Sequence, residues 1–465
     1  MSAGGGFPKW VMLEAYLFRR DDDESFPDNT KAPIRASGTT TWGADFRIAF
    51  SLAEPPQISR LYAQMPGFPG PQKEEPLAML ATHRHLALLV VFTMNPSKGL
   101  LRNFFVFRAN KHKPCSSSLT VLPPCTLPPF DYSRGSDGRL PRPSSPSRHY
   151  PDPSCPLDLP SLGLWCGGGD IKEEEEFVVA ELAPYVLTIG RSRHIKAFAD
   201  IRLLRASTTK WEALRVPIMP TTNDDLRKLS CWHTDAVVPF QQWLCWVDNL
   251  QGILFCDVSN KDKVHVSFLW FPPDLDPGTE EEENRCNSYY RGVSVVDHGR
   301  LLKFVNVQRH DSLDDYAALE PGTGFTISCH TLVLGGGGSM EWKKDDYTVT
   351  SDELPGYLQR LRGVPIYPQV DIERPHAVHF LYIEFGKAYE KMSLLSIDMS
   401  TKSLMYFDLY MDGNEYLHSG NKDCIIQGLD PDFVTTKSLS PSPTPFLPCE
   451  FPRFCRLSRK RKHRD

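Results

Sequence analysis

The sequence predicts a mainly β chain, organised as propeller-like repeats of antiparallel hairpins. Short runs of apolar, β-branched and aromatic residues alternate with breaks rich in Pro, Gly and Asp along most of the 465 residues. Strand, turn, strand units recur at intervals of roughly 40 to 50 residues, which is the size of one four-stranded propeller blade. Two β-sandwich domains are the alternative, because the repeat is weak and has no Trp-Asp or kelch signature.

Residues 1–108 form the first predicted β-rich part. Runs such as Trp10–Phe18 and Leu86–Phe92 have the length and the flanking turn residues of strands. The composition then changes over 109–162, where closely spaced prolines and serines leave few apolar residues for burial. We predict that 109–162 is a disordered Pro/Ser-rich insert in a single architecture, with a boundary between two domains as the alternative.

The main predicted propeller-like domain spans 163–432. Its clearest hairpin joins Trp243–Asp248 to Ile253–Val258 through the turn Asn249–Gly252. Further strands are predicted at Val264–Phe271, Val293–Val296, Leu301–Val305, Phe325–Leu334, Leu394–Asp398 and Ser403–Leu409. The one clear helical candidate is Ser351–Gly363, where Ser351 or Asp352 is suited to cap the helix and Pro355 fits its first turn.

The last segment, 433–465, is predicted to be a disordered basic tail. Its basic cluster consists of Arg459, Lys460, Arg461, Lys462 and Arg464. Such a cluster is read by nuclear import receptors or held by nucleic-acid phosphates, and a solvated tail without a receptor is the alternative. Import is favoured over sequence-specific DNA binding, because no base-reading motif accompanies the cluster. The net charge of −5 gives no overall attraction to nucleic acid or to an anionic membrane.

The sequence also bears on the compartment of the protein. No run approaches the roughly 18 apolar residues of a membrane span, and the glycine-rich start lacks the pattern of a secretory signal. The 12 cysteines are scattered without a Cys-x-x-Cys pair, which favours reduced and mostly buried thiols. We therefore expect an intracellular protein, nuclear or cytoplasmic, without a membrane partner.

Two glycine motifs resemble sites of chemistry without completing them. Gly190–His194 begins like a nucleophile elbow around Ser192, but the second glycine is missing. Gly335–Gly338 could bring backbone amides toward a phosphate, but the Lys-Ser/Thr that ends a phosphate loop is absent. A loop between strands explains the second motif, so neither predicts a catalytic or cofactor-binding residue.

Histidine pairs and acidic pairs are the remaining candidates for chemistry. His83 with His85, and His376 with His379, are the only close histidine pairs, and a metal site requires at least a third ligand. The acids in Asp314-Asp315 and Asp345-Asp346 point in opposite directions in an extended chain, so they make no acid and base pair. We expect no catalytic, cofactor-binding or metal residues.

Several ordered segments resemble the plant family known as domain of unknown function 1618. They are Phe7–Glu14, Trp246–Val258, Tyr290–Val305, Met340–Lys344 and the strand region Tyr382–Asp398. The resemblance implies a plant protein with a β-rich fold like that of F-box-associated propellers, and it brings no catalytic residue. Nothing before Trp10 provides the helical segment of an F-box, so we do not expect a direct place in a ubiquitin ligase.

The sequence is therefore expected to encode a non-enzymatic protein-interaction module with a protein partner. The loops Pro272–Asn284 and Gly335–Ser339 are the expected contact surfaces, because binding usually occurs on loops held by a rigid scaffold. The alternative is a nuclear regulatory or nucleic-acid-associated protein that uses the basic tail. A hydrolase built on Ser192 and His194 is the third hypothesis.

Overall fold

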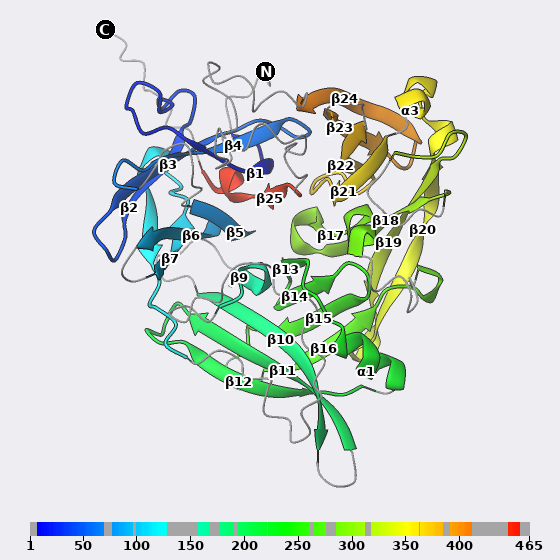
Figure 1. Cartoon of the computed structure of the whole chain (residues 1–465), viewed down its shortest axis with the longest axis horizontal. Coiled ribbons are helices and arrows are strands. Elements are labelled where there is room, and N and C mark those ends of the chain that lie inside the picture. Colours follow the sequence, from blue (N-terminus) through cyan, green and yellow to red (C-terminus); the bar gives the residue numbers. More distant parts are fainter. Residues whose placement is uncertain are drawn as a thin grey trace. The chain divides into compact units, whose positions relative to one another are not determined.

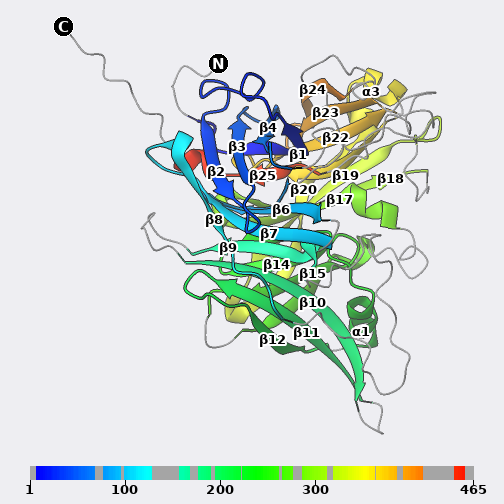
Figure 2. The ribbon, with the colours of Figure 1, turned by 60° about the vertical axis from the view of Figure 1, so that its left-hand side comes forward.

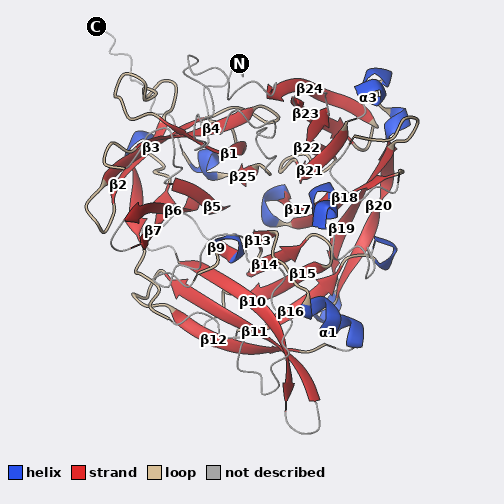
Figure 3. Ribbon diagram, viewed as in Figure 1, coloured by secondary structure: helices blue, strands red, loops and turns tan. Residues whose placement is uncertain are grey.

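The computed structural model describes residues 7–68, 77–95, 99–127, 157–167, 176–189, 194–220, 222–260, 264–275, 285–311, 318–361, 363–384, 391–411 and 445–455. It is mainly β, with 57% strand and 11% helix, which confirms the predicted fold class (Figure 3). The chain divides into two compact units. Unit 1 comprises Met1–Leu122, Gly386–Met392 and Leu409–Asp465, and unit 2 comprises Pro123–Phe385 and Ser393–Asp408.

Unit 1 contains a nine-stranded sheet within its described residues. The strand order is β25-β1-β4-β3-β2-β8-β7-β6-β5, with parallel pairs β1 and β4, and β2 and β8. Strand β5 also approaches β1 and β25, so the sheet is nearly closed. The strands are β1 (Val11–Arg19), β2 (Ile34–Thr39), β3 (Asp45–Ser51), β4 (Ile58–Gln64), β5 (Leu77–His83), β6 (Leu86–Asn95), β7 (Gly99–Arg108), β8 (Ser117–Val121) and β25 (Leu447–Cys449) (Figure 1).

Aromatic rings from distant parts of the chain fill the core of unit 1. Phe50 of β3 lies 5.3 Å from Phe107 of β7 and 4.8 Å from Phe451, measured between ring centroids. Phe46 of β3 packs edge-on against Phe105 of β7 at 5.1 Å. Each such ring buries a large apolar area, so these contacts between far-separated segments hold the sheet closed around its core.

Two predicted boundaries are wrong, because parts of the segments predicted to be disordered belong to unit 1. The insert was predicted to begin at 109, but β8 at Ser117–Val121 pairs with β7 and β2. The tail was predicted to begin at 433, but β25 pairs antiparallel with β1, and Phe451 is fully buried. The physical reason is tertiary: short apolar runs between prolines find partners that local composition does not reveal. Residues 128–156, 412–444 and 456–465 lie outside the described residues.

Unit 2 contains four four-stranded antiparallel sheets within its described residues, and each sheet keeps its strands in chain order. These are the propeller-like repeats that the sequence predicts (Figures 1 and 2). The strands are β9 (Leu162–Cys166), β10 (Phe177–Ile189), β11 (His194–Arg205) and β12 (Glu212–Ile218); β13 (Ala236–Phe240), β14 (Trp243–Asp248), β15 (Gly252–Asp257) and β16 (Val266–Trp270); β17 (Arg291–Val296), β18 (Leu301–Arg309), β19 (Phe325–Leu334) and β20 (Met340–Thr350); β21 (Val364–Val370), β22 (Ala377–Glu384), β23 (Lys391–Asp398) and β24 (Ser403–Met411).

Consecutive sheets of unit 2 meet at their first strands, with β9 beside β13, β13 beside β17 and β17 beside β21. The approach of β9 to β13 is close enough to require glycine: a Cβ on Gly163 would lie 2.4 Å from Val237 Cγ1. Trp246 of β14 is fully buried, and its Nε1 donates a 2.8 Å hydrogen bond to the carbonyl oxygen of Ser161. Farther along, the rings of Phe271 and Phe304 stack 3.8 Å apart. Buried apolar and hydrogen-bonded contacts therefore join the sheets.

The helices differ from the prediction. The predicted helix Ser351–Gly363 is split into a 3-10 turn at Ser351–Glu353, capped by Thr350, and a short helix α3 at Gly356–Leu361. Helix α1 at Asn223–Ser230 was not predicted. Its Thr222 cap and Asp225 exchange hydrogen bonds of 3.1 and 2.8 Å, and Trp270 Nε1 donates to Asp225 at 2.7 Å. Within the described residues, no helix is both long and apolar enough to cross a membrane.

The described cysteines are free thiols. Seven of these nine are buried, and Cys115 and Cys231 are exposed. Burial raises the pKa of Cys256 to about 12, which keeps this thiol protonated and unreactive. The predicted reduced and mostly buried thiols are therefore confirmed for the described part of the chain.

Candidate functional site

The densest polar network in the last sheet of unit 2 begins at the turn between β21 and β22. Asp371 directly follows β21, and its Oδ1 accepts hydrogen bonds from the backbone N–H groups of Glu373 and Arg374 at 2.9 and 3.0 Å. An aspartate that binds the backbone two residues ahead fixes a tight turn locally. The Asp371 N–H also donates to the carbonyl oxygen of Ala377, which closes the turn at the start of β22.

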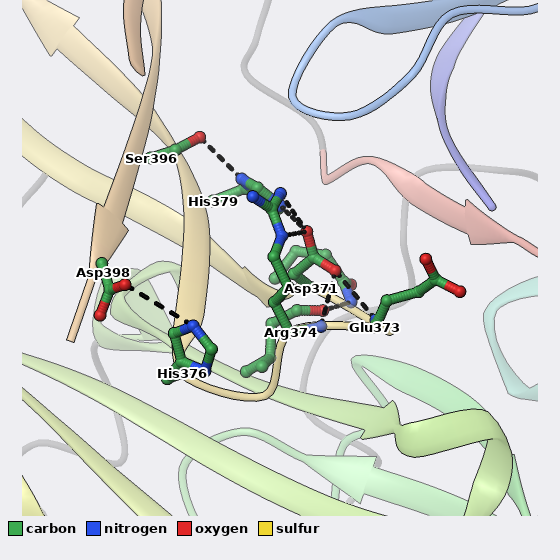
Figure 4. A network of polar contacts seen from close by, with 9 residues as sticks. Asp371, Glu373, Arg374, His376, His379, Ser396 and Asp398 are labelled. Atoms are coloured by element: carbon green, nitrogen blue, oxygen red, sulfur yellow. Dashed lines mark hydrogen bonds and ion pairs between the residues drawn. The ribbon is translucent and has the colours of Figure 1, made fainter. Parts of the chain in front are cut away.

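The other oxygen of Asp371 faces two cationic or ionisable side chains. Arg374 donates from Nε and Nη2 to Asp371 Oδ2, at 3.0 and 2.6 Å. His379 of β22 places its Nε2 3.3 Å from the same oxygen, and its Nδ1 lies 2.7 Å from Ser396 Oγ of β23 (Figure 4). Serine, histidine and aspartate thus form a continuous line across neighbouring strands.

This line has the connectivity of a catalytic triad, in which histidine bridges a serine hydroxyl and a carboxylate. Burial decides what it can do. The residues Asp371, His379 and Ser396 are only 2%, 1% and 1% exposed. A nucleophilic serine has to touch its substrate, and this hydroxyl faces the interior of the sheet. The arrangement therefore serves to satisfy buried polar groups and to tie the β21–β22 turn to β23.

The electrostatics of Asp371 agree with a structural role. Burial alone would raise its pKa, but hydrogen bonds from His379 and Arg374, together with their charges, lower the pKa to about 2. Asp371 is therefore a permanent carboxylate at neutral pH, and it can anchor both the turn and the ring of His379.

A second buried charge pair lies in the first sheet of unit 2. Glu181 of β10 and Arg202 of β11 face each other across the strand pair, and Arg202 Nη1 donates to Glu181 Oε2 at 2.9 Å. The backbone N–H of Asp158 donates to Glu181 Oε1 at 2.8 Å. Burial raises the pKa of Glu181 to about 7, against the lowering effects of Asp158 and Arg202. The pair is therefore sensitive to pH in the neutral range.

Unit 1 contains a buried carboxyl group of its own. Glu14 of β1 accepts a hydrogen bond from Tyr410, and its Oε2 lies 3.3 Å from Arg60 Nε. Burial raises the pKa of Glu14 to about 6, against the effects of Tyr410 and Arg60. The cost of burying this carboxylate is offset only in part by one hydroxyl and one guanidinium.

The structure separates the histidine pairs that the sequence singles out. His379 belongs to the buried network, whereas His376 lies 3.6 Å from Asp398 at a more exposed position. Arg108 Nη1 lies 3.2 Å from His85 Nε2, and burial lowers the pKa of His85 to about 4. In the described part of the chain, no group of three His, Cys, Asp or Glu residues is arranged to hold a metal ion.

The other sequence candidates have mixed positions. Gly335–Gly338 forms the turn between β19 and β20, as the loop interpretation predicts. Asp345 accepts a 2.6 Å hydrogen bond from Lys303, while Asp346 is exposed, so these two acids do point apart. Three candidates lie outside the described residues: Ser192 with the rest of 190–193, Asp314-Asp315, and the basic cluster 459–464 with Arg459, Lys460, Arg461, Lys462 and Arg464.

Sequence reasoning missed the partners of the two buried networks. Asp371 and Ser396 lie 8 and 17 residues from His379, on a turn and on the next strand. The acid before Ile-Glu-Arg-Pro was a usable signal for a turn, but nothing in the letters links it to Ser396. Glu181 and Arg202 meet only once the register of β10 on β11 is known.

Comparison with known families agrees with the resemblance seen in the sequence. Residues 246–379 match the family described as protein of unknown function (DUF1618). This segment is a DUF1618 domain. The DUF1618 segment begins at Trp246 and ends at His379, so it includes Asp371 and excludes Ser396. No protein among the curated sequences matches the chain.

Proposed function

We propose that this chain with its DUF1618 segment is a non-enzymatic module that binds a protein partner through exposed loops of unit 2. The observation that carries the proposal is the end of the β19–β20 hairpin. Val333 and Leu334 are 45% and 40% exposed there, directly before the glycine turn. Neighbouring exposed apolar side chains on a rigid scaffold are typical of contact sites for a partner.

The hairpin holds these two side chains in a defined position. Val333 pairs with Glu341 and Leu334 with Met340 across the strands, and the Gly335 N–H donates to the carbonyl oxygen of Ser339 at 2.8 Å. Charged residues such as Glu341 and Lys343 lie exposed beside the apolar pair. An apolar centre with a polar rim is the usual anatomy of a protein interface. Of the other expected loop, Pro272–Asn284, residues 276–284 lie outside the described residues.

The non-enzymatic part of the proposal is supported by where the reactive side chains lie. The serine, histidine and aspartate line is buried, and the buried charge pairs are engaged with each other. The exposed face of the hairpin, in contrast, offers shape and apolar area, which are suited to recognition.

The test is affinity purification of the tagged full-length chain, followed by mass spectrometry. The double variant V333D/L334D is compared with Ile195→Asp, which makes the same change at another exposed apolar residue of unit 2. We expect a reproducible partner set with the wild type and with I195D that is reduced at least tenfold with V333D/L334D. Equal recovery with both variants, or no specific partner with the wild type, would contradict the proposal.

The basic cluster 459–464 supports a second candidate function, which is entry into the nucleus through an import receptor and action there as a regulator. Replacing Lys460, Arg461 and Lys462 by alanine tests this candidate. We expect a fluorescent fusion to shift from the nucleus to the cytoplasm while recovery of the hairpin-dependent partners is unchanged. A distribution identical to that of the wild type excludes the cluster as an import signal.

A further inference from the structure

Strand β24 is the outermost strand of the sheet β21-β22-β23-β24, and β23 is its neighbour in that sheet (Figures 1 and 2). An outermost strand presents one side of its backbone to whatever lies outside the sheet, and it is a ready template for another strand. Proteins usually protect such edges with charges, proline or short length.

The other outermost strands of unit 2 carry these protections. Strand β20 has Glu341, Lys343, Lys344, Asp345 and Asp346 along its length, β12 contains Glu212, Arg215 and Pro217, and β16 has only five residues. Strand β24 has nine residues, Ser-Leu-Met-Tyr-Phe-Asp-Leu-Tyr-Met, with a single charge at Asp408. Among the described outer edges of unit 2, β24 is therefore the long one without protection.

One face of β24 exposes apolar side chains. Met405 and Leu409 are 40% and 54% exposed, and Phe407 stands between them on the same face because strand side chains alternate. Tyr357 of α3 is also exposed and lies 5.9 Å from Phe407 between ring centroids. Edge position and exposed apolar side chains coincide in one place, which is the combination that favours addition of a strand.

We propose that β24 pairs antiparallel with β24 of a second copy of this chain, around a two-fold axis at Phe407. Rotation about that axis places Met405 opposite Leu409 and Tyr406 opposite Asp408, in both directions. The apolar face thus meets itself, and the only charge of the strand meets a tyrosine hydroxyl instead of a like charge. Tyr406 already donates to Asp408 within the strand at 3.1 Å, so this chemical pairing is one that the two groups accept.

The self-complementarity distinguishes a second copy from an unrelated partner. A two-fold interface requires that the same patch match itself, and cross-strand apolar pairs without like charges satisfy this condition. One strand pair buries less than the roughly 1,200 Å² of a standard stable interface, so the dimer is expected to be weak and concentration-dependent. The proposal uses residues other than those of the β19–β20 hairpin, so either proposal can fail without the other.

Sedimentation velocity of the full-length chain, under reducing conditions that exclude disulfides through Cys115 and Cys231, tests the dimer. We expect the wild type to shift from monomer to dimer as its concentration rises from micromolar to submillimolar. The variant Met405→Lys is expected to weaken dimerisation at least tenfold. Met219→Lys, the same substitution at another exposed methionine of unit 2, is expected to dimerise like the wild type.

A charge exchange tests the register itself. M405K/L409K and M405E/L409E are each expected to be monomeric, because like charges then face each other at both 405–409 pairs. An equimolar mixture of the two is expected to form a heterodimer, which shows that both variants are folded. A wild type that stays monomeric at all concentrations, a M405K variant that dimerises like M219K, or a mixture that stays monomeric would overturn the proposal.

Discussion

Ser396 Oγ lies 2.7 Å from His379 Nδ1 in a part of the β21–β24 sheet where both side chains are buried. Neither group can exchange this hydrogen bond for one to water without opening the sheet. A buried polar group without a partner is more costly than the bond itself is favourable. The pair is therefore expected to matter for stability.

Ser396→Ala is expected to lower the free energy of unfolding by about 1–3 kcal/mol, because it leaves the buried Nδ1 of His379 without its partner. Urea unfolding followed by tryptophan fluorescence measures the change as a shift of the midpoint at constant slope. Ser400→Ala is the control, since Ser400 also binds a neighbouring side chain, Asp398, but does so at the surface. The control is expected to change stability by less than about 0.5 kcal/mol. Equal effects at the two serines would contradict a stabilising role for the buried line.

Glu181 is expected to make stability depend on pH in the range 4.5 to 7. Its pKa is about 7 in the folded chain against an ordinary value of 4.5, so the folded chain holds a proton that the unfolded chain has released. This contribution is fully present below pH 4.5 and is lost as the pH rises through 7. A shift of this size corresponds to about 3 kcal/mol.

The measurement is the urea midpoint at closely spaced pH values for the wild type and for Glu181→Gln. The amide cannot titrate, so the variant is expected to lose most of the decline in stability between pH 5 and pH 7. Glu176→Gln, a change at an acid outside this ion pair, is the control and should keep the slope of the wild type. A slope in E181Q equal to that of the wild type would show that Arg202 holds Glu181 charged throughout this range.

Gly163 and Val237 set the spacing between the first two sheets of unit 2. Gly163→Ala is expected to destabilise the chain by about 1–3 kcal/mol, because the new methyl group would overlap Val237 Cγ1. Val237→Ala removes the obstructing methyl group. The double variant G163A/V237A is therefore expected to be more stable than the sum of the two single changes predicts, by about 0.5–3 kcal/mol.

Thermal or urea unfolding of the four chains in this cycle measures the coupling. Gly336→Ala, at a glycine with no atom within 4 Å of the added Cβ, is the control for the general effect of replacing glycine. Strict additivity of G163A and V237A would mean that the sheets move apart freely, and it would contradict close packing at this point.

The sequence by itself determined the repeated strand pattern and the hairpin at Trp243–Asp248. Turn residues between apolar runs act locally, so they were readable, and β14 and β15 begin and end within one residue of the prediction. The sequence also carried the resemblance to DUF1618, which holds for residues 246–379. The signal for α1 was present as Thr222 and Asp225 three residues apart, a capping pair that was not used.

Tertiary structure alone decided the rest. Strand β25 joins β1 across more than four hundred residues of chain, and Phe451 is buried in a core that its proline-rich surroundings do not suggest. The line from Asp371 through His379 to Ser396 exists only because β22 and β23 are neighbours in one particular register. Short sequence windows report local preferences, whereas burial and pairing depend on contacts between distant segments, and those contacts fix which side chains can act at the surface.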